Sequence, residues 1–122
     1  KVISTTAAPG AIGPYSQAID TGTFVYASGQ IPINPANGEV VEGIKAQTEQ
    51  SIANVTAILN EAGLSLENVV KTTVFLADMN DFAAMNEVYG NAFKAPYPAR
   101  SAVAVRELPK KVLVEIEVIA MR

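Results

Sequence analysis

The sequence predicts a single α+β domain in which two amphipathic helices cover one face of a six-stranded mixed sheet, in the order βββ-α-β-α-ββ. Two observations predict this fold. Several runs are rich in β-branched and aromatic residues, as strands are, and two longer segments repeat apolar residues at helical spacing. The chain has 122 residues, 49% of them hydrophobic and 17% charged, so residues 1–122 should form one domain around one core.

The chain begins with three short predicted strands, which lie at residues 2–5, 16–20 and 23–28. The third strand carries the run TFVYAS and ends at Gly29. Residues 31–40 contain two prolines and an Asn37-Gly38 pair, so we expect an irregular loop that is closed by a tight turn.

Two helices are expected, one on each side of a strand at residues 68–78. The first helix, residues 43–62, ends at Gly63 and turns its polar face away from the sheet, with Lys45, Glu49, Asn54 and Glu61 on that face. Asp81 can cap the second helix. The inner face of that helix consists of Phe82, Met85, Val88, Tyr89 and Phe93.

The last two predicted strands, residues 100–108 and 112–121, are separated by a short turn. If they pair as a hairpin, opposite residues have numbers that sum to about 217 to 219. Arg100 would then lie near residues 116–119 and could reach Glu115 or Glu117.

The face of the sheet without helices needs another cover, because two helices cover only one face. Along residues 112–120 one set of alternating side chains is purely apolar and belongs under the helices. The other set consists of Leu113, Glu115, Glu117 and Ile119, which is too apolar for a solvated face and too charged for a dry core. This mixture favours a subunit interface that contains a polar pocket.

Arg100 stands at the mouth of an apolar run, YPARSAVAV, and needs an anion because a guanidinium stays charged at any accessible pH. One interpretation is a structural ion pair with a glutamate on the neighbouring strand. The other is a binding site, in which the guanidinium takes a ligand carboxylate and a nearby glutamate handles a water or a proton.

Composition excludes several kinds of chemistry. The chain has no cysteine and no histidine, which removes disulfides, thiol nucleophiles, imidazole bases and the usual zinc or iron ligands. A net charge of -3 and the lack of a long basic cluster argue against nucleic acid as a partner. No apolar run has the length of a membrane span, so a cytoplasmic location is expected unless a targeting segment preceded Lys1.

Five segments resemble the signature segments of the RidA/YjgF family of reactive-intermediate imine deaminases. They are GPYSQA at 13–18, ASGQIP at 27–32, VVKTTVFLADMNDFAAMNEVY at 69–89, PARSAVAV at 98–105 and VEIEVIA at 114–120. The resemblance implies a single RidA-like domain with a chorismate-mutase-like fold. It also implies a homotrimer with a central barrel and with sites between subunits.

The implied activity is hydrolysis of 2-imino acids, such as 2-iminobutanoate and 2-iminopropanoate, to 2-oxo acids and ammonia. These imines are by-products of pyridoxal-phosphate-dependent dehydratases, and the implied hydrolysis uses no cofactor and no metal. The alternative is a non-catalytic trimer that binds small carboxylic acids as a regulator or acts like a chaperone. A ribonuclease is a third and less favoured option, given the acidic balance and the absence of histidine.

The resemblance also implies roles for individual residues. Arg100 would clamp the substrate carboxylate, and Glu115, the first glutamate of EIE, would hold the hydrolytic water. The implied substrate-binding positions are Tyr15, Ser28, Gly29, Asn86 and Ala102, with Gly29 and Ala102 acting through their backbone amides. Many relatives have cysteine at position 102, so the alanine here excludes a thiol role and leaves the amide.

Structural roles remain open for three of these positions. Tyr15 could be an aromatic residue at the rim of a subunit contact, and Gly29 could simply end a strand. Asn86 could bond a nearby loop instead of a ligand.

Overall fold

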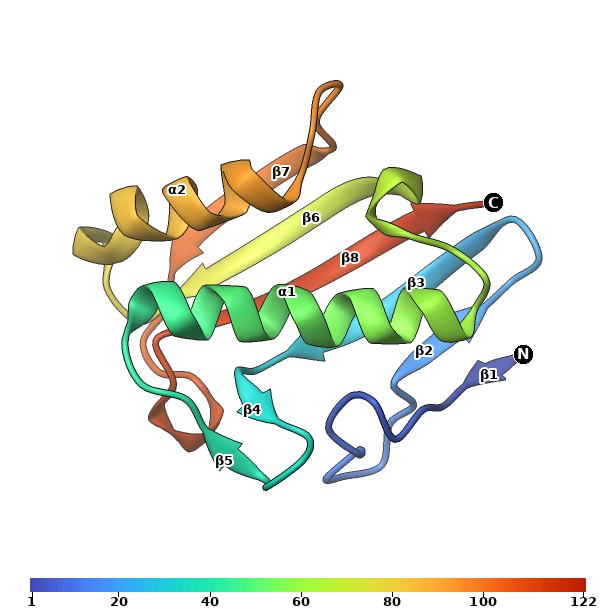
Figure 1. Cartoon of the computed structure of the whole chain (residues 1–122), viewed down its shortest axis with the longest axis horizontal. Helices are drawn as coiled ribbons and strands as arrows, with labels where there is room; N and C mark the ends of the chain where they lie inside the picture. The colour runs from blue at the N-terminus through green and yellow to red at the C-terminus, as the bar shows by residue number, and fades with distance from the viewer.

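The computed structural model describes residues 1–122 and shows one mixed sheet with both helices on the same face (Figure 1). The six-stranded sheet has the spatial order β1-β2-β3-β8-β6-β7. Its strands are β1 (Val2–Ile3), β2 (Ala18–Asp20), β3 (Phe24–Gln30), β6 (Val69–Leu76), β7 (Ala99–Ala104) and β8 (Val114–Met121). A separate two-stranded hairpin, β4 (Ile33–Asn34) and β5 (Glu39–Val40), forms within the predicted loop. The predicted α+β class and element order are confirmed.

The predicted hairpin between the last two strands is wrong. Strand β8 lies between β3 and β6 and is antiparallel to both, whereas β7 pairs in parallel with β6 at the edge of the sheet. Two physical reasons explain the difference. A strand reached from β6 through a helix returns parallel to β6, and the fully apolar inner set of β8 favours a central position.

The two helices are α1 (Ile44–Glu61) and α2 (Phe82–Ala92). Helix α1 crosses β3 and β8, and its buried apolar residues meet those of the sheet in one core. The largest fully buried apolar side chains are Ile58, Leu59, Leu76, Met85 and Ile116. No helix is long and apolar enough to cross a membrane.

Asn54 departs from the predicted polar face of α1, because it is only 1% exposed. Its Nδ2 donates to the carbonyl oxygens of Ile31 at 3.2 Å and Ile33 at 3.0 Å. A buried amide is stable when its donors are satisfied in this way. Asn54 therefore holds the segment that leaves β3 against the helix.

Helix α2 is preceded by a short 3-10 turn, Met79–Asp81, and its start differs from the prediction. Asp81 makes no side-chain capping bond; instead, the Asp78 carboxylate accepts from the Asn80 N–H at 2.8 Å. The inner face of α2 is confirmed, since Met85, Tyr89 and Phe93 are buried.

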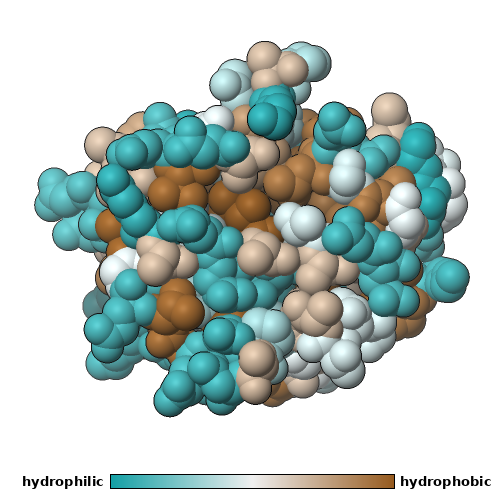
Figure 2. Space-filling model, in the orientation of Figure 1, coloured by the Kyte–Doolittle hydropathy of each residue, from teal (hydrophilic) through white to brown (hydrophobic).

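The opposite face of the sheet carries no helix, as predicted. Tyr26 of β3 is 47% exposed there, and Ile19 of β2 is 41% exposed. Leu113 and Ile119 are half-buried on the same face, whereas Val114, Ile116 and Val118 of β8 are buried under the helices. The side of the molecule that carries the helices shows a mixture of hydrophilic residues and hydrophobic patches (Figure 2).

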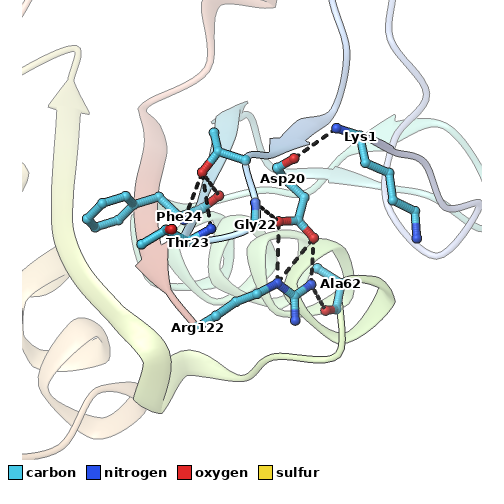
Figure 3. A network of polar contacts seen from close by, with 8 residues as sticks. Lys1, Asp20, Gly22, Thr23, Phe24, Ala62 and Arg122 are labelled. Carbon is cyan, nitrogen blue, oxygen red and sulfur yellow. Dashed lines mark hydrogen bonds and ion pairs between the residues drawn. The ribbon is translucent and has the colours of Figure 1, made fainter.

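A polar network ties the end of β8 to β2 and α1 (Figure 3). The Arg122 guanidinium binds the Asp20 carboxylate at 2.6 Å and also donates to the Ala62 carbonyl at the end of α1. The Gly22 N–H donates to the same carboxylate at 2.8 Å. The hydrogen bonds from Arg122 and Gly22 lower the pKa of Asp20 to about 2.

Candidate functional site

Arg100 lies on β7 with its side chain on the helix side of the sheet. Its Nη1 donates to Asn86 Oδ1 at 2.7 Å, and its Cζ is 4.7 Å from the centroid of the Tyr89 ring. The Phe82 ring is 5.6 Å away by the same measure. Helix α2 therefore supplies every one of these contacts to the guanidinium, because Arg100 and α2 lie on the same side of the sheet.

Arg100 has no carboxylate partner within the chain. The ion pairs in the structure join Lys45 to Glu87 and Arg122 to Asp20. The interpretation of Arg100 as one half of a structural ion pair with Glu115 or Glu117 is therefore wrong. Arg100 lies opposite Thr72 of β6 and is not next to β8, which carries both glutamates. Asn86 accepts one Nη1 hydrogen, so the other N–H donors of the guanidinium remain free.

A cavity of about 370 Å³ opens beside the guanidinium. We call its lining the arginine half-site; it consists of Asn86, Tyr89, Gly90, Tyr97, Pro98 and Arg100. Strand β7 is the edge of the sheet, and the Val105 N–H donates inward to Leu76. Because amide directions alternate along a strand, the Ala102 N–H points outward from that edge and is free to bind a ligand.

Glu115 lies on the other face of the sheet, because it alternates along β8 with the buried Val114 and Ile116. Its carboxyl group lies directly over Gly29 of β3, and a Cβ at position 29 would be 2.9 Å from the Glu115 Cδ. Burial raises the pKa of Glu115 above its ordinary value, and the negative charge of Glu117 raises it further.

Ser28 comes directly before Gly29 on β3, and Tyr15 comes directly before Ser16, whose carbonyl bonds to Ser28. The Ser28 Oγ donates to the Ser16 carbonyl at 2.6 Å, which fastens the loop that carries Tyr15 to β3. The Tyr15 hydroxyl accepts from the Ile12 N–H at 3.2 Å, and the side chain is 48% exposed. We call Tyr15, Ser28, Gly29 and Glu115 the glutamate half-site.

The two half-sites do not meet within one chain. Arg100 faces α2, whereas Glu115 faces the open side of the sheet, and a sheet separates the two faces. The sequence-predicted residues thus fall into two groups, with Asn86, Arg100 and Ala102 in one and the glutamate half-site in the other. The largest cavity, about 740 Å³, lies along the N-terminal segment and is lined by neither Arg100 nor Glu115.

Tyr89 was not predicted to take part in function, and Glu117 was considered only as a glutamate within reach of Arg100. Tyr89 was assigned only to the core, yet its ring contacts Arg100. The spacing to Asn86 is a signal that could have found it, because residues three apart on a helix share a face. Glu117 influences the pKa of Glu115, and both face the same side because they are two residues apart on a strand.

Comparison with known proteins shows close relatives over the whole chain. The profile of the family described as Endoribonuclease L-PSP matches residues 5–122. A RutC family protein of Pyrococcus abyssi is 58% identical over 123 residues, which cover 100% of this chain and 97% of that protein. The 2-iminobutanoate/2-iminopropanoate deaminase of Salmonella typhimurium is 52% identical over 125 residues, covering 100% of this chain and 98% of that enzyme.

Solved structures agree with this result. The crystal structure of Escherichia coli TdcF with bound serine has a TM-score of 0.97 at 51% identity, covering 100% of this chain and 98% of that one. At these identities the similarity extends to the sequence as well as to the fold.

Proposed function

Because the chain belongs to the RutC/RidA family, whose profile is described as Endoribonuclease L-PSP, we propose that it hydrolyses 2-imino acids to 2-oxo acids and ammonia. The substrates would be 2-iminobutanoate and 2-iminopropanoate, as in the name of the Salmonella relative. The reaction would take place in the cytoplasm, where these reactive imines would be removed as they form. The observation that carries the proposal is the partly exposed Arg100 guanidinium, which has free donors, a cavity beside it and no carboxylate partner within the chain.

The complete site would form between two copies of the chain. One copy would supply the arginine half-site and its neighbour the glutamate half-site, because the two lie on opposite faces of one sheet. We propose a homotrimer in which the open face lines a central barrel, since Tyr26 and Ile19 are exposed on that face.

The substrate carboxylate would bind Arg100 through two parallel N–H donors. Asn86 already takes one hydrogen of Nη1, which leaves the adjacent Nε–H and Nη2–H pair free. The outward Ala102 N–H and the Gly29 backbone would lie near the imino group and stabilise charge that develops during attack.

Glu115 would act on the water. Burial and the Glu117 charge raise its pKa, which makes it a better proton acceptor than an exposed glutamate. The water oxygen would form a bond to the imino carbon, and Glu115 would accept one water proton and pass it to the nitrogen. The resulting carbinolamine would then pass its hydroxyl proton to the nitrogen, again through Glu115. As the carbonyl double bond forms, the carbon–nitrogen bond would break, which releases ammonia and leaves the 2-oxo acid.

A coupled assay tests this proposal. Threonine dehydratase acting on threonine produces 2-iminobutanoate, so adding this protein should speed the release of 2-oxobutanoate. Arg100→Ala should abolish the gain, because truncating one side of a charge-assisted clamp costs about 2–5 kcal/mol. If the wild-type protein leaves the rate unchanged, it is not an imine deaminase.

Two other functions have specific support. The bound serine in TdcF suits a trimer that only holds small carboxylic acids, in which case Glu115→Gln would not alter function. The family description names an endoribonuclease, although the chain has a net charge of -3 and no histidine. RNA cleavage that Arg100→Ala and Glu115→Gln leave intact would support that function over the deaminase.

A further inference from the structure

Tyr89 belongs both to the core and to the lining of the arginine half-site. The side chain is 5% exposed, its ring stacks on Phe93 with centroids 4.4 Å apart, and the Arg100 Cζ is 4.7 Å from the ring centroid. The ring therefore contacts the guanidinium as well as the core, and this guanidinium has no carboxylate partner within the chain. The contact is of the cation–π type, which is strongest where water is excluded.

The Tyr89 hydroxyl is fixed at its far end. It shares a hydrogen bond of 2.8 Å with the Thr72 Oγ1, and Thr72 is completely buried. Thr72 is also the residue directly opposite Arg100 in the pairing of β6 with β7. The strand that positions the Arg100 backbone therefore also anchors the ring that contacts the Arg100 side chain.

The tyrosine stays a neutral phenol. Burial raises the pKa of Tyr89 above its ordinary value, against the smaller opposing effects of the Thr72 hydrogen bond and the Arg100 charge. Tyr89 thus offers Arg100 a ring face and not a phenolate charge.

We propose that Tyr89, anchored by Thr72, is a positioning residue that holds the Arg100 guanidinium in the plane required for a substrate carboxylate. Asn86 holds the guanidinium at one Nη1 hydrogen, and Tyr89 holds it from the ring face. These two contacts leave the Nε–H and Nη2–H edge free, and that edge takes the carboxylate. The inference rests on the proposed function, because it gives Arg100 the carboxylate of a 2-imino or 2-oxo acid.

Binding of 2-oxobutanoate, measured by calorimetry, tests the role of Tyr89 without any chemistry. Tyr89→Leu removes the ring and should weaken binding about 3- to 30-fold, the range of a cation–π contact. Tyr89→Phe keeps the ring and should bind more tightly than Tyr89→Leu. Leu59→Ala is the matched control, since Leu59 is fully buried in α1 and lines neither half-site, so it lowers the melting temperature without changing the affinity.

The anchor is tested by a double-mutant cycle. Thr72→Val and Tyr89→Phe should each weaken binding, and the double variant should be no weaker than the single ones, because both remove the same hydrogen bond. In the imine assay, Thr72→Val and Tyr89→Phe should each raise KM and leave kcat nearly unchanged. The reason is that the Arg100 guanidinium binds the carboxylate equally in the substrate and in the transition state.

Three outcomes would overturn the inference. They are a folded Tyr89→Leu protein that binds 2-oxobutanoate as the wild type does, additive losses in the double-mutant cycle, and a wild-type protein that does not bind 2-oxobutanoate. A wild-type protein that binds 2-oxobutanoate but does not hydrolyse the imine would refute the proposed enzyme alone. The binding series would then still decide the role of Tyr89.

Discussion

The Glu115 carboxyl group occupies the space in which a side chain at position 29 would begin, so Gly29 and Glu115 lie in direct contact across β3 and β8. Glycine is the residue that permits this approach, because it has no Cβ. Gly29 has no positive φ, so the need for glycine comes from the carboxylate and not from the backbone.

Gly29→Ala should inactivate the protein without unfolding it. The new methyl group displaces the end of a flexible side chain, so the unfolding free energy should change by less than ~1 kcal/mol. The displaced carboxylate should lower kcat about a hundredfold, as a misplacement of about 1 Å can. The matched control is Gly10→Ala, because a Cβ at Gly10 meets nothing within 4 Å. Equal activity of the two variants would contradict the positioning of Glu115 by Gly29.

Glu117→Gln should move the acid limb of the pH–rate profile. The proposed base is active when Glu115 is ionised, so the rate should fall as pH drops through its pKa, which lies above the ordinary value. Removing the Glu117 charge favours ionised Glu115, lowers that pKa and shifts the limb to lower pH. The profile is measured as kcat/KM with 2-iminobutanoate from an amino-acid oxidase. A limb that stays in place would show that Glu117 has no influence on the base.

Mixing two inactive variants should restore activity. Arg100→Ala chains keep the glutamate half-site and Glu115→Gln chains keep Arg100, so a site between unlike copies can be complete. Equal amounts of the two variants, refolded together, should give about a quarter of wild-type activity. A site is complete only if one copy has Arg100 and the neighbour that faces it has Glu115, and each of these conditions holds for half of the chains. Unmixed variants refolded alone are the control, and the mixture should sediment at three times the 12.8 kDa chain mass. A mixture as inactive as its parents would refute a shared site.

Asp20→Asn should make stability less dependent on pH. The pKa of Asp20 is lowered from 3.8 to about 2, first by the Arg122 hydrogen bond. A lowered pKa gives stabilisation that is full above about pH 4 and is lost as pH falls toward about 2. Melting temperatures between pH 5 and 2 should fall more steeply for the wild type than for Asp20→Asn. Glu42→Gln, at an exposed position, should keep the wild-type slope.

Local patterns in the sequence predicted most of the fold. Helical spacing predicted both helices, because side chains that share a helix face recur at a period of 3.6 residues. Alternation along residues 112–120 predicted which side chains of β8 lie under the helices and which lie on the open face. Exceptions arise where distant segments supply the partner, as Asn54 shows: its amide is buried because it binds carbonyls 23 and 21 residues away.

The sequence by itself determined the set of chemical groups and the two faces of each element, since both follow from residue type and from neighbours along the chain. Only the tertiary structure decided that β8 lies between β3 and β6, and that Arg100 and Glu115 lie on opposite faces. Strand pairing depends on contacts between residues far apart in the chain, and a local pattern does not select among the possible partners. For that reason the Arg100 guanidinium contacts the Tyr89 ring, whereas the sequence pattern had placed a glutamate within its reach.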